Sequence, residues 1–320
     1  MRMLAGLVIL SVLTTEPSFS VTFDGLRNPN PVVTFDHGFV GAWDLEQVHS
    51  LTLYDPDGHR MFDVSSVTLP DGTKSDAPIS VAIDSDGTSA VVYWFEEGTR
   101  AGVAILDKAG NHVRVIETQP YRPAQVCFAP DHSIWTLGDQ WKVNLRPADD
   151  FMVFHHYSRN GNLLGSFVPR SALPTWEGMG VDQVVAPFVG GWRLRASQDR
   201  IGAALWAALL LGSDKQAWVE LDLQGGLMAQ WIYSNSPGEA VMPAAFTSDG
   251  QLFGMHSIEG NRIGISVFDK PTSSWRPAPW VPNGSLRGAD GMRLVYQEGD
   301  QLRWINRFDR KVESASSKRP

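Results

Sequence analysis

The sequence predicts an all-β protein, a six-bladed β-propeller in which six similar four-stranded sheets stand around a common axis. Three observations predict this fold. A short strand that ends in Asp recurs along the chain, turn-forming aspartates recur at a similar offset from it, and 43% of the 320 residues are hydrophobic, which is enough for a large core. We expect the propeller to occupy residues 21–310.

The repeated strand ends in an apolar or aromatic residue followed by Asp, and one of its copies is degenerate. Successive copies end 52, 51, 64, 47 and 40 residues apart, which fits blades of ~40 to 50 residues with one larger insertion. The six copies are Leu53-Tyr54-Asp55, Ile105-Leu106-Asp107, His156-Tyr157-Ser158, Glu220-Leu221-Asp222, Val267-Phe268-Asp269 and Arg307-Phe308-Asp309.

A second set of aspartates, usually followed by Gly, precedes these strand ends by 19 to 27 residues. Asp and Gly tolerate turn conformations that β-branched residues resist, so we expect these positions to close the hairpin between the first two strands of each blade. Turns such as Asp107-Lys108-Ala109-Gly110 are expected to close the hairpin between the last two strands. The aspartates of the first kind are Asp36, Asp86, Asp131, Asp199, Asp249 and Asp290.

The second blade shows the repeating unit most clearly. Alternating apolar residues and β-branched residues predict strands over 79–83, 90–95, 102–106 and 112–117. The last repeat has three such strands and then little apolar sequence. We expect the segment Val21-Thr22-Phe23-Asp24 to supply the fourth strand and close the ring, because closure protects sheet edges.

Two features of the chain depart from the simple repeat. The run from Ala203 to Leu211 is rich in Ala and Leu, which favour a helix, but it falls where the other blades place their second strand, so we predict a buried strand. The segments from Gly138 to Phe151 and from Val168 to Gly190 are long connections, and long loops in compact domains often carry function.

The N-terminal segment has the composition of a signal peptide. Arg2 precedes an apolar run from Leu4 to Leu13, and the small residues Ser18 and Ser20 flank Phe19 where a signal peptidase would cut. We therefore predict a signal peptide over residues 1–20, a secreted or periplasmic protein, and no membrane insertion after cleavage. An uncleaved membrane anchor is the weaker alternative, because the apolar run is too short to span a bilayer. The basic, Ser-rich residues 311–320 are expected to be a disordered tail.

Charge and cysteine content exclude several classes of function. The formal charge of −8 and the pI near 5.5 disfavour binding to nucleic acid and to anionic membranes, which require a basic surface. The single cysteine, Cys127, excludes an intramolecular disulfide framework and any metal site built on paired cysteines.

The strand and turn pattern of Val81-Ala82-Ile83-Asp84-Ser85-Asp86-Gly87 and of Phe128-Ala129-Pro130-Asp131 resembles that of the six-bladed β-propeller superfamily, which contains NHL-repeat, TolB-like and gluconolactonase-like proteins. The resemblance implies a ring with ligands at one mouth, formed by the loops between the second and third strands and by the connections between blades. It implies one of two activities, a scaffold that binds proteins or a hydrolase of lactones or esters with calcium in the channel.

Sequence motifs for catalysis are absent. The chain has no Gly-x-Ser-x-Gly, no His-Glu-x-x-His and no Walker-type phosphate loop, and no set of Glu, Asn and Asp at equivalent blade positions matches a calcium site. Our leading hypothesis is therefore a binding module for a protein or peptide, with no metal and no cofactor. The alternative is a calcium-dependent hydrolase of lactones or esters, whose acidic candidates are Glu97, Glu177, Asp182, Asp214 and Glu259.

The predicted binding residues lie in loops on one face of the ring. The stretch from Trp141 to Arg146 joins an aromatic ring, an amide and two cations, a combination that can stack on a ring or pair with a carboxylate. Six other tryptophans, Trp43, Trp94, Trp135, Trp206, Trp218 and Trp304, fall in predicted strands and are assigned to the core. The predicted contacts are Glu97, Arg100, Tyr121, Trp141, Lys142, Arg146, Trp176 and Arg262.

Overall fold

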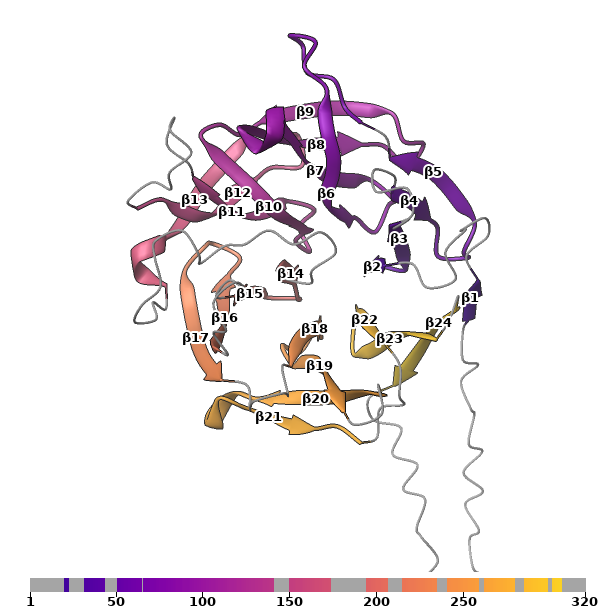
Figure 1. The fold of residues 1–320 in the computed structure, drawn as a ribbon, viewed down its shortest axis with the longest axis vertical. Coiled ribbons are helices and arrows are strands. Elements are labelled where there is room, and N and C mark those ends of the chain that lie inside the picture. The colour runs from indigo at the N-terminus through magenta and orange to yellow at the C-terminus, as the bar shows by residue number, and fades with distance from the viewer. Residues whose placement is uncertain are drawn as a thin grey trace, which may run out of the picture.

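Six antiparallel four-stranded sheets stand around a central axis in the computed structural model, as Figure 1 shows. Five of the sheets take their four strands in chain order, and the sixth adds the N-terminal strand to the last three. The predicted six-bladed β-propeller is confirmed. The structure describes residues 20–22, 32–43, 51–64, 66–140, 150–173, 194–206, 215–234, 241–258, 262–279, 285–298 and 301–306.

The first three blades run from a strand beside the axis to a strand on the outside of the ring (Figure 1). Blade one contains β2 (Val32–Asp36), β3 (Phe39–Trp43), β4 (Leu51–Tyr54) and β5 (Arg60–Val64). Blade two contains β6 (Ser75–Ile83), β7 (Ser89–Phe95), the 3-10 turn η1 (Glu96–Gly98), β8 (Arg100–Leu106) and β9 (His112–Glu117). Blade three contains β10 (Tyr121–Phe128), β11 (Ile134–Gln140), β12 (Met152–Tyr157) and β13 (Leu163–Pro169), followed by η2 (Arg170–Ala172).

The other three blades repeat this arrangement. Blade four contains β14 (Leu194–Ala196), β15 (Arg200–Trp206), β16 (Lys215–Asp222) and β17 (Leu227–Ser234). Blade five contains β18 (Met242–Phe246), β19 (Leu252–Ile258), β20 (Arg262–Asp269), η5 (Lys270–Thr272) and β21 (Ser274–Pro277). Blade six contains β22 (Ser285–Asp290), β23 (Arg293–Glu298), β24 (Gln301–Asn306) and β1 (Ser20–Thr22).

The N-terminal strand closes the ring, as the sequence predicts. β1 pairs antiparallel with β24, and Val21 lies opposite Leu302. This pairing gives blade six its fourth strand and covers the outer edge of β24, which would otherwise be open to pairing with another chain. The predicted signal peptide lies almost wholly, and the predicted tail wholly, outside the described residues.

The Ala- and Leu-rich run forms a strand over the part that the structure describes. β15 ends at Trp206, and Ala203 and Leu205 pair with Val219 and Ala217 of β16. Both side chains are buried in the core between blades three and four. The strand prediction is therefore confirmed up to residue 206, and residues 207–211 lie outside the description.

The core lies between the faces of neighbouring blades. Trp135 and Trp218 are fully buried and Trp43 is nearly so, while Trp94 and Trp304 are partly buried and pack against core clusters. This confirms the assignment of these tryptophans to blade packing, where large aromatic rings fill the widening space between sheets. Trp206 lies in β15, but its side chain is outside the description.

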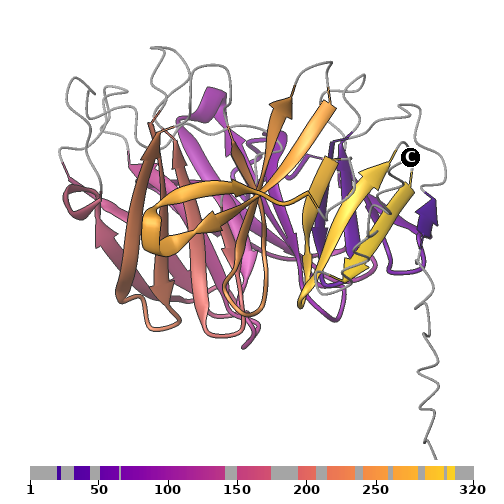
Figure 2. The ribbon, with the colours of Figure 1, turned by 90° about the horizontal axis from the view of Figure 1, so that it is seen from below.

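The ring has two unlike rims. All six hairpins between first and second strands lie at one rim, and we call this rim the turn face; Figure 2 shows the ring edge-on. The connections between second and third strands and between blades lie at the opposite rim, the loop face. The predicted turn aspartates all fall in or beside turn-face hairpins, as at Asp86 between β6 and β7.

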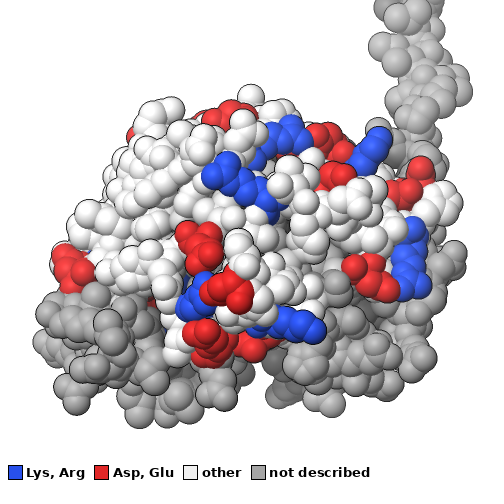
Figure 3. Space-filling view, turned by 90° about the horizontal axis from the view of Figure 1, so that it is seen from above, with Lys and Arg blue, Asp and Glu red and all other residues white. Residues whose placement is uncertain are grey.

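Charged side chains on the flank of the ring are mixed in sign. Figure 3 shows Lys and Arg interspersed with Asp and Glu on this side of the molecule. Ion pairs join surface charges of the described residues, as between Arg60 and Asp63 of β5. In the parts of the chain that are described, no helix is long and apolar enough to cross a bilayer.

Candidate functional site

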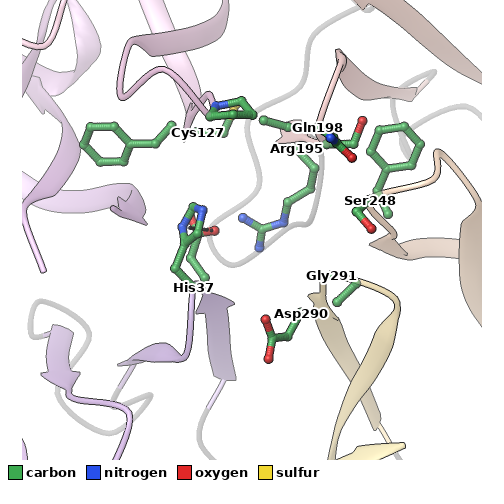
Figure 4. Close-up of a pocket in the computed structure, with 14 residues that line it drawn as sticks. His37, Cys127, Arg195, Gln198, Ser248, Asp290 and Gly291 are labelled. Carbon is green, nitrogen blue, oxygen red and sulfur yellow. Dashed lines mark ion pairs between the residues drawn. The ribbon is translucent and has the colours of Figure 1, made fainter. Parts of the chain in front are cut away.

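A pocket of about 330 Å³ lies at the axis on the turn face. Its walls come from the ends of the innermost strands and the hairpins that follow them in five of the six blades. Figure 4 shows the labelled side chains around this space. Blade one contributes His37, blade three Cys127, blade four Arg195 and Gln198, blade five Ser248, and blade six Asp290 and Gly291.

A tight turn places His37 in the pocket wall. His37 and Gly38 both have positive φ, at 49° and 88°, and join β2 directly to β3. A two-residue hairpin with two positive φ values matches the twist of the flanking strands, and Gly and His are among the residues that tolerate this backbone. The turn thereby fixes the imidazole at the mouth of the channel.

His37 is held by a carboxylate and by the next blade. Its Nδ1 lies 3.0 Å from the carbonyl oxygen of Ile83 and 3.3 Å from Asp36 Oδ1. The hydrogen bond and charge of Asp36 raise the pKa of His37 to about 9, although partial burial opposes the shift. The imidazole is therefore a cation at neutral pH.

Arg195 brings a second cation into the pocket from the innermost strand β14. Figure 4 shows its guanidinium pointing into the space bounded by His37 and Asp290. Its Nη2 donates to Thr34 Oγ1 at 3.0 Å, so the side chain reaches across the axis from blade four to blade one. Burial lowers the pKa of the Arg195 guanidinium and Asp36 partly offsets this, but an arginine still remains protonated at neutral pH.

A neighbouring cluster fixes the turn face without entering the pocket. The buried carboxylate of Asp84 lies 2.8 Å from His132 Nδ1 and accepts a hydrogen bond from the Ser85 amide at 2.7 Å. Arg159 Nη1 lies 3.8 Å from the same carboxylate. Because His132 belongs to blade three and Asp84 to blade two, these contacts lock two hairpins together and stiffen the rim.

We predict that the free energy of unfolding falls as the pH rises into the alkaline range, because His37 loses its charge there. The pKa of His37 is about 9 in the folded protein, above the usual 6.5. The protonated imidazole therefore stabilises the fold, with its full contribution below about pH 6.5, and this contribution is lost as the pH rises through about 9. The side chain is 39% exposed, so solvent screening reduces the expected effect to about 1 kcal/mol. The free energy of unfolding in urea should fall less between pH 7 and pH 9.5 for His37→Asn than for the wild type. Asparagine is chosen because it also tolerates a positive φ. Equal losses in the variant and the wild type would contradict the prediction.

The described residues at this mouth do not fit a channel calcium ion. The carboxylates of Asp36 and Asp290 are paired with His37 and Arg293, and the Arg195 guanidinium enters the same space. A calcium ion requires several oxygen ligands and is repelled by adjacent cations. Among the described residues, one group of three His and acidic side chains approaches metal-binding distances, at the outer turn of Asp55, Asp57 and His59.

That outer group is the hairpin turn between β4 and β5, of the same kind as the turn predicted at Asp107-Lys108-Ala109-Gly110. Asp55 Oδ1 accepts hydrogen bonds from the backbone amides of Asp57 and His59, at 3.0 and 2.8 Å. The carboxylate is thus used to close the turn between β4 and β5.

The binding residues predicted from the sequence lie elsewhere. Glu97 lies in η1 and Arg262 begins β20, both at the loop face. Arg100 Nη1 is 2.7 Å from Asp71 and its Nη2 is 3.0 Å from Glu117, so these acids hold it on the blade. Tyr121 is 2% exposed and its hydroxyl donates to the Val153 carbonyl at 3.1 Å, which makes it a core residue. Trp141, Lys142, Arg146 and Trp176 lie outside the described residues.

Sequence reasoning missed the residues that line the pocket. His37 stands inside a turn that the sequence identifies through Asp36, but turn chemistry alone assigns it no further role. Arg195 lies in a three-residue strand beside a long connection, with no repeat signal of its own. One signal was available, because a His in place of the usual Gly or Asn of a tight turn is unusual.

Comparison with known proteins gives similarity in fold only. No protein-family model and no curated protein matches the sequence. Among solved structures, a gluconolactonase from Xanthomonas campestris is 15% identical, with coverage of 90% of this chain and 86% of that chain and a TM-score of 0.47. The periplasmic gluconolactonase of Pseudomonas aeruginosa is 16% identical, with 86% and 80% coverage and a TM-score of 0.44. U3-55K is 10% identical, with 88% and 97% coverage and a TM-score of 0.48.

Proposed function

We propose that this propeller is a binding module for a protein or peptide, and that the ligand inserts one side chain or chain end into the turn-face pocket. The observation that supports this most strongly is the convergence of five blades on one axial pocket with Arg195 and His37 in its wall. A volume of about 330 Å³ is at the lower end of the range for small-ligand pockets, so it suits a single side chain with its adjoining backbone.

The rigidity of the pocket wall favours recognition. Ser248 N donates to the Gly291 carbonyl at 2.9 Å and thus joins the hairpins of blades five and six. Within blade four, Ser197 N donates to the Arg200 carbonyl at 2.8 Å and closes the turn that carries Gln198. A wall held by backbone hydrogen bonds loses little conformational entropy when a ligand binds, which raises affinity.

Two predictions from the sequence, the contacts at the loop face and export from the cell, are also part of the proposal. Trp141, Lys142, Arg146 and Trp176 are proposed contacts for a larger partner at the loop face. We also propose export to the periplasm or the cell exterior. Mass spectrometry of the mature N-terminus should then find a start near Val21, which keeps Val21 and Thr22 available to pair with β24.

A pair of glutamine variants tests the proposed site. Gln198 is exposed at the pocket rim, and Gln224 is exposed in the outer turn of the same blade, between β16 and β17. Random peptides with free C-termini would be selected on the immobilised wild-type protein and the affinities of the enriched sequences measured. We expect Gln198→Trp to weaken binding at least tenfold by filling the pocket, and Gln224→Trp to leave it unchanged.

The proposal fails if no sequence is enriched on the wild-type protein. It also fails if Gln198→Trp binds the selected peptides as tightly as the wild type does, because the pocket would then play no part.

A further inference from the structure

We infer that the outer edge of blade four is a dimerisation surface, at which β17 of one copy of the chain pairs antiparallel with β17 of a second copy. The inference is independent of the proposed function, because β17 lies on the outside of the ring and the turn-face pocket lies at its axis (Figure 1). In the part of the chain that the structure describes, β17 pairs with β16 alone. Its other edge therefore offers backbone N–H and C=O groups to a further strand.

The outer strands of the blades differ in their protection against pairing with another chain. Blade six is protected because its outer strand β1 is only three residues long. Charged residues protect blades one, two and five, namely Arg60 and Asp63 in β5, Arg114 and Glu117 in β9, and Arg276 in β21. The outer strands of blades three and four, β13 and β17, contain no charged residue.

Of these two uncharged strands, β17 is the better template for a partner strand. β13 contains Gly165, ends at Pro169 and has a positive φ of 57° at Val168, and each of these features disturbs a regular ladder. β17 contains neither Gly nor Pro, and residues 229–234 pair with β16 without a bulge. A regular, uncharged outer strand of eight residues is open to pairing with another strand.

The side chains of β17 alternate between blade five and the solvent. The ring of Trp231 lies 6.2 Å from that of Phe268 in blade five, between ring centres. Because side chains alternate along a strand, Met228, Gln230 and Ile232 point the other way, and all three are exposed. Met228 is 51% exposed and Ile232 is 47% exposed. Two large apolar side chains thus flank a glutamine on the free face of an outer strand.

The order of these three residues favours a second copy of the chain as the partner. A two-fold axis through Gln230 places Met228 of each copy opposite Ile232 of the other, and Gln230 opposite its counterpart. Apolar side chains then meet apolar side chains, and the two amides can each donate and accept a hydrogen bond. Antiparallel pairing of identical strands has the two-fold symmetry that is commonest among homodimers. The pairing brings no like charges of β17 together, which matters because the chain carries a formal charge of −8.

Sedimentation of the wild-type protein gives the first test. One pair of strands buries little surface, so we expect a monomer–dimer equilibrium with a dissociation constant in the micromolar range. Sedimentation velocity of the full chain over a range of concentrations would measure this constant. A protein that stays monomeric into the high micromolar range would overturn the inference.

Two variants of opposite charge at position 230 test the position of the two-fold axis. Gln230→Lys alone and Gln230→Glu alone each place like charges opposite one another, so each should raise the dissociation constant of the dimer at least tenfold. An equimolar mixture of the two variants should dimerise at least tenfold more tightly than either variant alone, because lysine then faces glutamate. The control is Val113→Lys on the outer strand β9, where Val113 is 65% exposed, and it should leave the constant unchanged.

The mixture decides the inference even if both variants are less stable than the wild type, because it is compared with each variant alone. If the mixture dimerises no more tightly than its components, the two strands do not meet at Gln230 and the inference is wrong. It is also wrong if Ser166→Lys in β13 dissociates the dimer and Gln230→Lys does not, because blade three would then form the interface. Gln230→Lys should bind the selected peptides as tightly as the wild type does, so failure of one proposal leaves the other standing.

Discussion

Replacement of Glu220 by alanine is expected to lower the free energy of unfolding by about 3 kcal/mol, because it leaves two partly buried cations without the anion that they share, although Arg200 keeps its pairing with Asp199. Glu220 lies in β16 and is 1% exposed. Its Oε2 is 3.0 Å from Arg200 Nη1, and its Oε1 is 2.6 Å from Lys270 Nζ. The indole Nε1 of Trp218 also donates to Oε1, at 2.9 Å.

This cluster links two blades, which is why its loss should be costly. Lys270 belongs to η5 of blade five, and its Nζ lies 5.2 Å from the centre of the Trp231 ring of blade four. Glu220→Gln should cost less than Glu220→Ala, because the amide oxygen can still accept from Trp218. Unfolding in urea at pH 7, followed by tryptophan fluorescence and by circular dichroism, gives the two values.

An exposed pair serves as the control for Glu220. Asp63 pairs with Arg60 on the surface of β5, where both side chains are about half exposed. Asp63→Ala should therefore change the free energy of unfolding by less than about 1 kcal/mol. If Glu220→Ala costs no more than Asp63→Ala, the buried cluster does not stabilise the contact between blades four and five.

Replacement of Trp135 by alanine is expected to cost about 3 to 5 kcal/mol through the cavity that it leaves. Trp135 lies in β11 with no exposed surface, stacked on His156 at 4.3 Å and on Phe167 at 5.4 Å between ring centres. Its indole Nε1 has no hydrogen-bond partner among the described residues, so the loss is one of packing.

The control for Trp135 is an apolar residue on the surface of the same blade. Met152 begins β12 and is 41% exposed, so Met152→Ala should cost less than about 1 kcal/mol in the same urea experiment. Trp135→Phe should fall between the two, because the smaller ring fills part of the space. A loss below about 1 kcal/mol for Trp135→Ala would show that blades three and four can collapse around the gap.

The fold could be predicted from the sequence because its determinants are local and repeated. A turn such as Asp86-Gly87 needs little more than its own residues to form, and six copies at similar spacing specify six hairpins. The main error concerns strand length, because β6 starts at Ser75 and the prediction began at residue 79. The strand runs through Pro78 with bulges on both sides. Proline is tolerated there because β6 is an edge strand facing the axis.

The pocket could not be predicted because it depends on contacts between distant blades. The pKa of His37 is set by Asp36 beside it and by the Ile83 carbonyl of the next blade, 46 residues away. Arg195 meets Thr34 across 161 residues of sequence. A repeat specifies where each hairpin forms, but it does not specify which side chains meet where six hairpins converge.

Mapping of backbone amide shifts would test the position of the binding site most directly. The backbone amide resonances of the isotope-labelled wild-type protein would be assigned, and the protein would be titrated with a peptide selected on it. We predict that the perturbed amides cluster around His37, Gln198, Ser248 and Gly291, which line the turn-face pocket. Perturbations confined to the loop face, at residues such as Arg100 and Gln140, or none at all near saturating ligand, would contradict it.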